Sequence, residues 1–170
     1  TGIFSGCVAF HEKYSCSTEN DGPADSCEFK FKVEQANFQT AVNSCLEEER
    51  LMKGDGAILK GDCTTYGTVT NKYGVMSDWD VSLVTKMNSA FQSKTTFNGD
   101  ISNWDVSSVV DMNYMFYSAN AFNGDISNWD VSSVVTMSHM FYSANSFTQD
   151  LSSWQTSSLT SMYRIMYASY

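Results

Sequence analysis

A string of fourteen residues occurs twice, without any change, in the second half of this chain. FNGDISNWDVSSVV fills residues 97–110 and again residues 122–135, so the two copies start 25 residues apart. The same interval separates four tryptophans, Trp79, Trp104, Trp129 and Trp154. Self-similarity at a period of about 20–50 residues is typical of arrays in which each unit buries its apolar face against its neighbours. The repeat therefore predicts a stack of similar units over residues 74–170.

The apolar positions inside one unit suggest how it folds. Ile101, Trp104, Val106 and Val109 stand at the spacing of the leucine-rich-repeat skeleton, in which the middle positions form a strand. Because Val109 stands where that skeleton has Asn or Cys, we expect its inward asparagine ladder to be absent or replaced. The positions after the strand have helical spacing, which predicts a short helix over residues 109–119. The fold class expected is α/β, a short leucine-rich-repeat-like solenoid of parallel strands plus short helices with a 25-residue period.

Residues 1–73 have no period and are expected to form a small helical, disulfide-containing N-terminal cap. Apolar residues at three-to-four spacing predict an amphipathic helix over residues 28–52, which Gly54 would end. FKFKV at residues 29–33 alternates and could instead be a strand. No cysteine has zinc-finger spacing, so two disulfides and one spare thiol are expected, which indicates an oxidising compartment. The candidates are Cys7, Cys16, Cys27, Cys45 and Cys63.

The distribution of charge excludes some partners. The net charge is −9, and no Lys or Arg occurs between Lys94 and Arg164, where six aspartates fall. Nucleic acids and anionic lipids bind basic clusters, so neither is an expected partner of the repeats. No apolar run is long enough to cross a bilayer, so any contact with a membrane complex would be peripheral. The sequence shows no signal segment, so we expect Thr1 to begin a mature or trimmed chain.

The repeat residues resemble a known family. The pattern W-D-V-S-x-V-x-x-M-x-x-M-F-x-x-A-x-x-F-N-x-D, as it stands from Trp104 to Asp125, is similar to the BspA-type leucine-rich repeat (DUF285) of bacterial and algal surface proteins. The segment before the repeats resembles algal members, which suggests an algal-type protein. The resemblance implies a surface, adhesion or protein-interaction module without shared catalytic residues. The last repeat departs from the pattern at Gln155, Thr156 and Arg164, which predicts a more polar, partial cap.

Two sets of side chains are candidates for partner binding. The repeat skeleton would turn one polar set outward on the exposed sheet face: Asn103, Asp105, Ser107, Asn128, Asp130 and Ser132. The aspartates could instead accept hydrogen bonds from their own turns, and a calcium role is a weaker alternative. A second set, the edge aromatics Tyr117, Tyr142 and Tyr167, would offer amphipathic rings. Paired methionines could hold Cu(I), although core packing suits them better, so no metal or cofactor is expected.

The function expected from these features is non-catalytic. No motif for nucleophilic, zinc, phosphate or dinucleotide chemistry occurs in the sequence, and its two histidines, His11 and His139, lie in different parts of the chain. We expect an extracytosolic protein-interaction or scaffolding module that docks onto a larger complex. Two forms stay open: a lumenal accessory subunit of an algal photosynthetic membrane complex, in the thylakoid lumen, or a secreted or cell-surface adhesin-type module.

Overall fold

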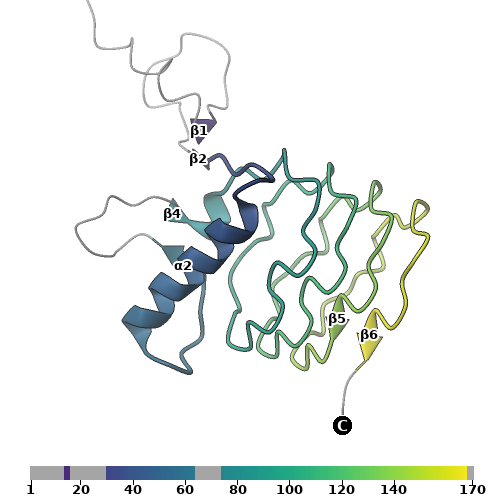
Figure 1. Ribbon diagram of the computed structural model, residues 1–170. Helices are drawn as coiled ribbons and strands as arrows, with labels where there is room; N and C mark the ends of the chain where they lie inside the picture. The colour runs from purple at the N-terminus through teal and green to yellow at the C-terminus, as the bar shows by residue number, and fades with distance from the viewer. Residues whose placement is uncertain (1–13, 16–29, 64–73, 168–170) are drawn as a thin grey trace, which may run out of the picture.

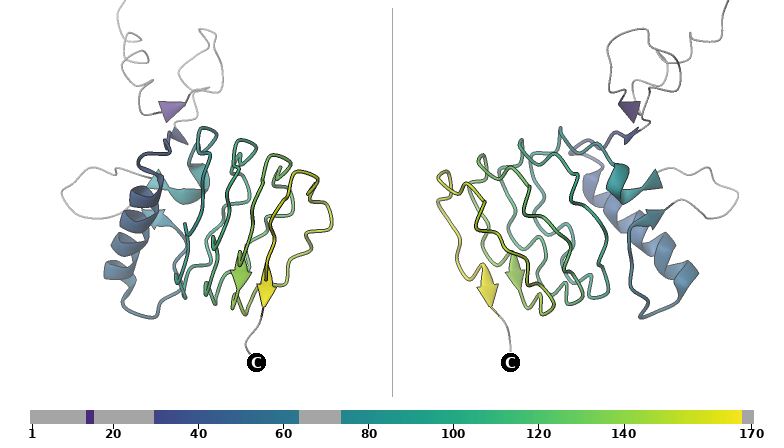
Figure 2. Two further views of the ribbon diagram at one scale, coloured as in Figure 1. Left: turned by 45° about the vertical axis from the view of Figure 1, so that its right-hand side comes forward. Right: turned by 180° about the vertical axis from the view of Figure 1, so that it is seen from behind.

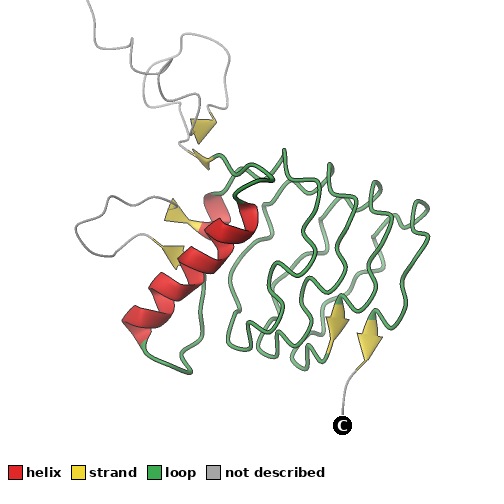
Figure 3. Ribbon diagram, in the orientation of Figure 1, coloured by secondary structure: helices red, strands yellow, loops and turns green. Residues whose placement is uncertain are grey.

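The computed structural model describes residues 14–15, 30–63 and 74–167, and it contains a small helix and several very short strands. Strands β1 (Tyr14–Ser15) and β2 (Lys30–Phe31) pair antiparallel, as do β3 (Asp62–Cys63) and β4 (Gly74–Val75). The helix α2 (Phe38–Lys53) lies between these hairpins in the sequence. A 3-10 turn, η2 (Met76–Asp78), leads into the repeats, where β5 (Phe141–Tyr142) and β6 (Met166–Tyr167) pair parallel. Figure 3 shows that loops and turns make up most of the rest.

The repeats form four successive windings of the chain that lie side by side (Figures 1 and 2). Isolated parallel bridges join Lys86 to Asp111, Asp111 to Thr136 and Thr136 to Ser161, so each winding is in register with the one 25 residues later. The indoles of Trp104, Trp129 and Trp154 each donate to a carbonyl 28 residues earlier, as Trp129 Nε1 does to Ile101 O at 3.1 Å. The 25-residue period of the sequence is thus the period of the hydrogen bonding.

A ladder of backbone amides joins consecutive windings and replaces the helices expected over residues 109–119. The N–H groups of Met112, Tyr114, Phe116 and Ser118 donate to carbonyls of the next winding at 2.8–3.0 Å. An α-helix needs those same N–H groups for its own i−4 carbonyls. Tyr114 and Ser118 also have left-handed φ values of 58° and 54°, which end any helical turn. The helix prediction was wrong because every second amide of this stretch donates to a carbonyl of the next winding, and not to a carbonyl of its own winding.

The strands expected around residues 103–107 and 128–132 are also absent from the described windings. Trp104 N donates to Ile101 O and Val109 N to Val106 O, so the chain turns at both places. Parallel pairing occurs further along each winding, at residues 111, 136 and 161 and in β5 and β6. The leucine-rich-repeat template therefore placed the apolar residues correctly and the strand incorrectly.

The core is made of stacked rows of equivalent residues. Phe91, Phe116 and Phe141 form one row, with ring centroids 5.4 and 5.5 Å apart and nearly parallel planes. The tryptophan row, the methionines Met87, Met112 and Met137, and the valines Val84, Val109 and Val134 are buried in the same way. The asparagine ladder usual in leucine-rich repeats was expected to be absent or replaced. A different asparagine position forms a ladder instead, in which Asn98 Oδ1 accepts from Asn123 N and Asn123 Oδ1 accepts from Thr148 N, both at 3.0 Å.

Helix α2 covers the first winding (Figure 1). It begins at Phe38, later than the expected residue 28, because Lys30–Phe31 is the strand that FKFKV allowed and Glu34 to Asn37 form a turn. Gly54, at a φ of 89°, follows its last residue as expected. Cys45 and Cys63 lie at disulfide distance, with Cα atoms 5.1 Å apart. Cys7, Cys16 and Cys27 lie outside the described residues. Within the described parts of the chain, no helix has the length and apolar character needed to cross a bilayer.

Candidate functional site

The residues predicted to line a sheet face lie in turns, with their aspartates already hydrogen-bonded. Asp105 Oδ1 accepts from Ser107 N at 3.1 Å and from Ser107 Oγ at 2.6 Å, and Asp130 accepts from Ser132 N at 3.0 Å. Hydrogen bonds from Ser132 hold the pKa of the Asp130 carboxyl below its usual range. This is the turn-stabilising role that the sequence left open. Asn103 and Asn128, two residues before these aspartates on the two neighbouring windings, are exposed. A partner role for the whole set stays a prediction.

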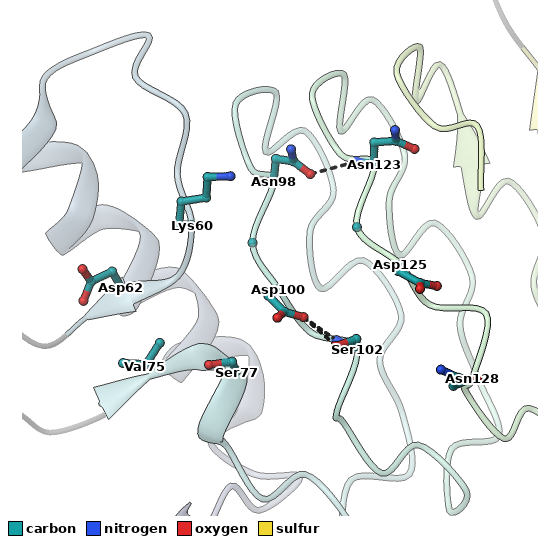
Figure 4. Close-up of a pocket in the computed structure, with 12 residues that line it drawn as sticks. Lys60, Asp62, Val75, Ser77, Asn98, Asp100, Ser102, Asn123, Asp125 and Asn128 are labelled. Atoms are coloured by element: carbon teal, nitrogen blue, oxygen red, sulfur yellow. Dashed lines mark hydrogen bonds between the residues drawn. The ribbon is translucent and has the colours of Figure 1, made fainter.

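A second row of aspartates borders a groove at the junction between the cap and the windings (Figure 4). Asp100 and Asp125 lie on adjacent windings, and each accepts from the N–H and hydroxyl of the serine two residues later. These hydrogen bonds lower the pKa of both carboxyls. The groove has a volume of ≈ 800 Å³, and Lys60, Asp62, Asn98 and Asn123 also line it. Sequence analysis missed this row, although the D-x-S spacing that marks it is the same as at Asp105.

The groove depends on a close approach between the cap and the first repeat. A Cβ on Gly99 would lie 2.5 Å from the carbonyl oxygen of Lys60, so only glycine fits there. Three carboxylates and one ammonium group line the groove, which makes it suited to a cationic group. In the described residues no three His, Cys, Asp or Glu side chains are arranged to hold a metal ion.

The predicted edge tyrosines do lie together, but mostly against each other. Tyr117 and Tyr142 are stacked with ring centroids 5.0 Å apart, and so are Tyr142 and Tyr167. A parallel row follows, in which Tyr114 stacks on His139 at 4.9 Å. Since neighbouring rings cover one another's faces, an inner tyrosine offers mainly its edge to a partner. Of the predicted three, Tyr167 is the most open, with 49% of its surface exposed.

The last winding exposes side chains that every earlier winding buries. Met162 is 55% exposed, whereas its equivalents Met87, Met112 and Met137 are at most 1% exposed. Met166, 56% exposed, stands at the position of the buried Phe91, Phe116 and Phe141. Tyr163 and Tyr167 are also exposed beside them, at 60% and 49%. We call Met162, Tyr163, Met166 and Tyr167 the end surface. Gln155, Thr156 and Arg164 are themselves exposed, and the partial polar cap expected from them stays a prediction.

One family model matches this chain, over residues 64–170, which is more than half of its length; its description is "Mycoplasma protein of unknown function, DUF285". The match begins in the segment before the first winding and includes all the windings and the end surface. No curated protein and no solved structure is significantly similar to the chain.

Proposed function

Since the chain belongs to the DUF285 family, whose description assigns no activity, we propose a function from its surfaces: a non-catalytic solenoid that docks a protein partner on its end surface. The solenoid is of the leucine-rich-repeat-like kind, and α2 closes its first winding. The pair Cys45 and Cys63 at disulfide distance is consistent with an extracytosolic compartment. Docking onto a larger assembly would use the array as a spacer.

The observation that carries this proposal is the contrast between the last winding and the three before it. Met162 and Met166 are more than half exposed at positions where the earlier windings expose 3% or less. Fully burying a side chain of this size contributes about 1.5–3 kcal/mol. Tyrosine and methionine are enriched at protein interfaces, and charged residues are depleted at interface cores. The end surface has both properties, since its four members carry no charge.

The test is the native mass of the chain from its source, measured without reductant. We expect the unmodified chain to migrate with a large complex, and the double variant Met162→Glu/Met166→Glu to migrate alone near 19.0 kDa. Leu83→Glu and Leu51→Glu serve as matched controls, because these leucines are 52% and 70% exposed far from the end surface. Both controls should stay in the complex. Free migration of the unmodified chain, or retention of the double variant, would refute docking through this surface.

A further inference from the structure

The groove between the cap and the windings is built from one short string that occurs twice. Its wall on the repeat side contains N-G-D at residues 98–100 and again at residues 123–125. Asn98 Oδ1 accepts from Asn123 N at 3.0 Å, so the two strings lie side by side and in register. From the cap, the Lys60 side chain extends toward Asn98 (Figure 4). A ligand in the groove would therefore meet the same pair of side chains twice.

The third winding does not continue this wall. Residues 148–150 are Thr, Gln and Asp, and Gln149 stands at the position of Gly124. The Gln149 side-chain amide donates to Asn123 O at 3.0 Å, and residues 148–150 do not line the groove. The groove is thus two strings long.

Each string leaves one donor and one acceptor for a ligand. Among the described residues, the Nδ2 groups of Asn98 and Asn123 donate to no acceptor. Asp100 and Asp125 use their Oδ1 atoms for serines, and their Oδ2 atoms accept from no donor in the described part of the chain. The Lys60 ammonium group adds a further donor. A simple cation would pair with the carboxylates and leave the amide donors unmatched, so a fitting ligand offers donors and acceptors together.

Hydroxyl groups offer both, and the structure already contains the contact that they would make. Ser102 Oγ donates to Asp100 Oδ1 at 2.7 Å, and Ser127 Oγ donates to Asp125 Oδ1 at 2.7 Å. Hydrogen bonds from a hydroxyl to a carboxylate are roughly twice as strong as those between neutral groups. A ligand hydroxyl can bond the remaining Oδ2 in the same way, while its oxygen accepts from an asparagine amide.

The interval between the strings favours a chain of sugar rings over a peptide. Phe97 and Phe122, directly before the two strings, have ring centroids 5.7 Å apart. Side chains on one face of an extended peptide are about 6.6–6.8 Å apart, so a peptide would be roughly 1 Å out of step at the second string. Successive rings of an extended β-linked hexose chain repeat at close to the interval of the windings. The groove volume of ≈ 800 Å³ is ample for a small ligand.

We propose that this groove binds an extended, neutral, hydroxyl-rich glycan, with one sugar ring over each N-G-D string. Its hydroxyl groups donate to the Oδ2 atoms of Asp100 and Asp125 and accept from the Nδ2 groups of Asn98 and Asn123. Sulfated or carboxylated glycans would be repelled by the aspartates. The site is separate from the end surface, so it adds a second binding function that does not depend on docking there.

The probe is cellohexaose, a linear β-1,4-linked glucose hexamer, titrated into the full-length protein and followed by calorimetry and amide NMR. We expect a Kd of about 1 mM or tighter, with shifts at the amides of Gly99 and Gly124, which lie in the two strings. Maltohexaose has the same composition, but its α-1,4 links coil the chain. It should therefore bind at least tenfold more weakly.

The variant Asp125→Asn should weaken cellohexaose binding at least tenfold, because it removes a charged acceptor while its amide oxygen can still accept from Ser127. Asp150→Asn is the matched control. Asp150 Oδ1 accepts from Ser152 N at 2.9 Å in the equivalent turn of the next winding, and Asp150 does not line the groove. Binding to this control should be unchanged, and urea unfolding shows whether both variants are folded.

Four results would overturn the proposal. The first is the lack of shifts at Gly99 and Gly124 with about 1 mM cellohexaose, and the second is equal binding of the two hexamers. The third is an equal loss of binding in Asp125→Asn and Asp150→Asn. The fourth is binding of tetralysine in the groove without binding of cellohexaose, which would show a site for basic peptides.

Discussion

Four aspartates of the repeats each accept the backbone N–H of the serine two positions later, at 2.9–3.0 Å: Asp100, Asp125, Asp130 and Asp150. Hydrogen bonds from that serine hold the pKa of each carboxyl below its usual range; the hydroxyl bond is the larger cause at Asp100 and Asp130, and the N–H bond at Asp125 and Asp150. The ionised carboxylates therefore stabilise the turns in which they lie. Their repetition in the sequence follows from this local need as much as from any partner.

Replacing these four aspartates by asparagine should make the free energy of unfolding fall less as the pH is lowered into the acid range. In the unfolded chain an aspartate has a pKa of about 3.9, and the folded pKa is lower, so the unfolded state binds more protons as the pH falls. The stabilisation is present above about pH 3.9 and is lost as the pH drops through the folded pKa. Urea unfolding at about pH 6 and pH 3 should show a smaller loss for the variant. Equal losses in both proteins would contradict the assignment.

Helix α2 is attached to the segment that follows it through a buried carboxylate. The side chain of Glu49 is 0% exposed, and its oxygens accept from the N–H groups of Lys60 and Gly61 at 2.8–2.9 Å. Lys53 forms an ion pair with it. The pair Cys45 and Cys63 joins the same two segments. These contacts hold the loop that carries Lys60 and Asp62, and so they position one wall of the groove (Figure 4).

The substitution Glu49→Gln should lower the free energy of unfolding by roughly 3–5 kcal/mol, because it leaves a donor facing donors and removes the charge that Lys53 pairs with. Glu47→Gln is the matched control, since Glu47 pairs with Arg50 on the exposed side of the same helix. An exposed pair of this kind contributes about 0–1 kcal/mol. Chemical denaturation measures both. Similar losses in the two variants would show that burial of Glu49 contributes little.

At the scale of the whole molecule, the windings form a modular array. Removing residues 98–122 would join Phe97 to Asn123 and restore the repeat string, so we expect the shortened chain to unfold in one cooperative transition. Removing residues 98–109 takes away about half a period, brings Val110 after Phe97 and puts polar residues into core rows. That variant should lack a cooperative transition. Urea unfolding followed by tryptophan fluorescence separates the two cases, and equal behaviour of both deletions would contradict modular stacking.

Periodicity was enough to predict the core rows, because equivalent residues must repeat for identical windings to fit. Trp79, Trp104, Trp129 and Trp154 are each 9% exposed or less. It could not predict the backbone between them. Left-handed turns fall at Ser89, Tyr114, His139 and Arg164, none of which is the glycine that would signal such a conformation.

The candidate site was predicted less well than the fold. The tyrosine row was predicted, since its 25-residue spacing is visible in the sequence. The stacking of its rings against one another was not predicted. Of the end surface, Tyr167 was among the predicted aromatics, whereas Met162 was not singled out because it continues the methionine row of the sequence.

The amide ladder between windings also has a consequence for how the chain reaches its folded state. Contacts between windings are only about one period apart, and local contacts of this kind favour fast folding. Since α2 already covers the first winding, that winding is the natural nucleus, and each completed winding offers both donors and acceptors to the next. Growth would then proceed from the helix outward, one winding at a time.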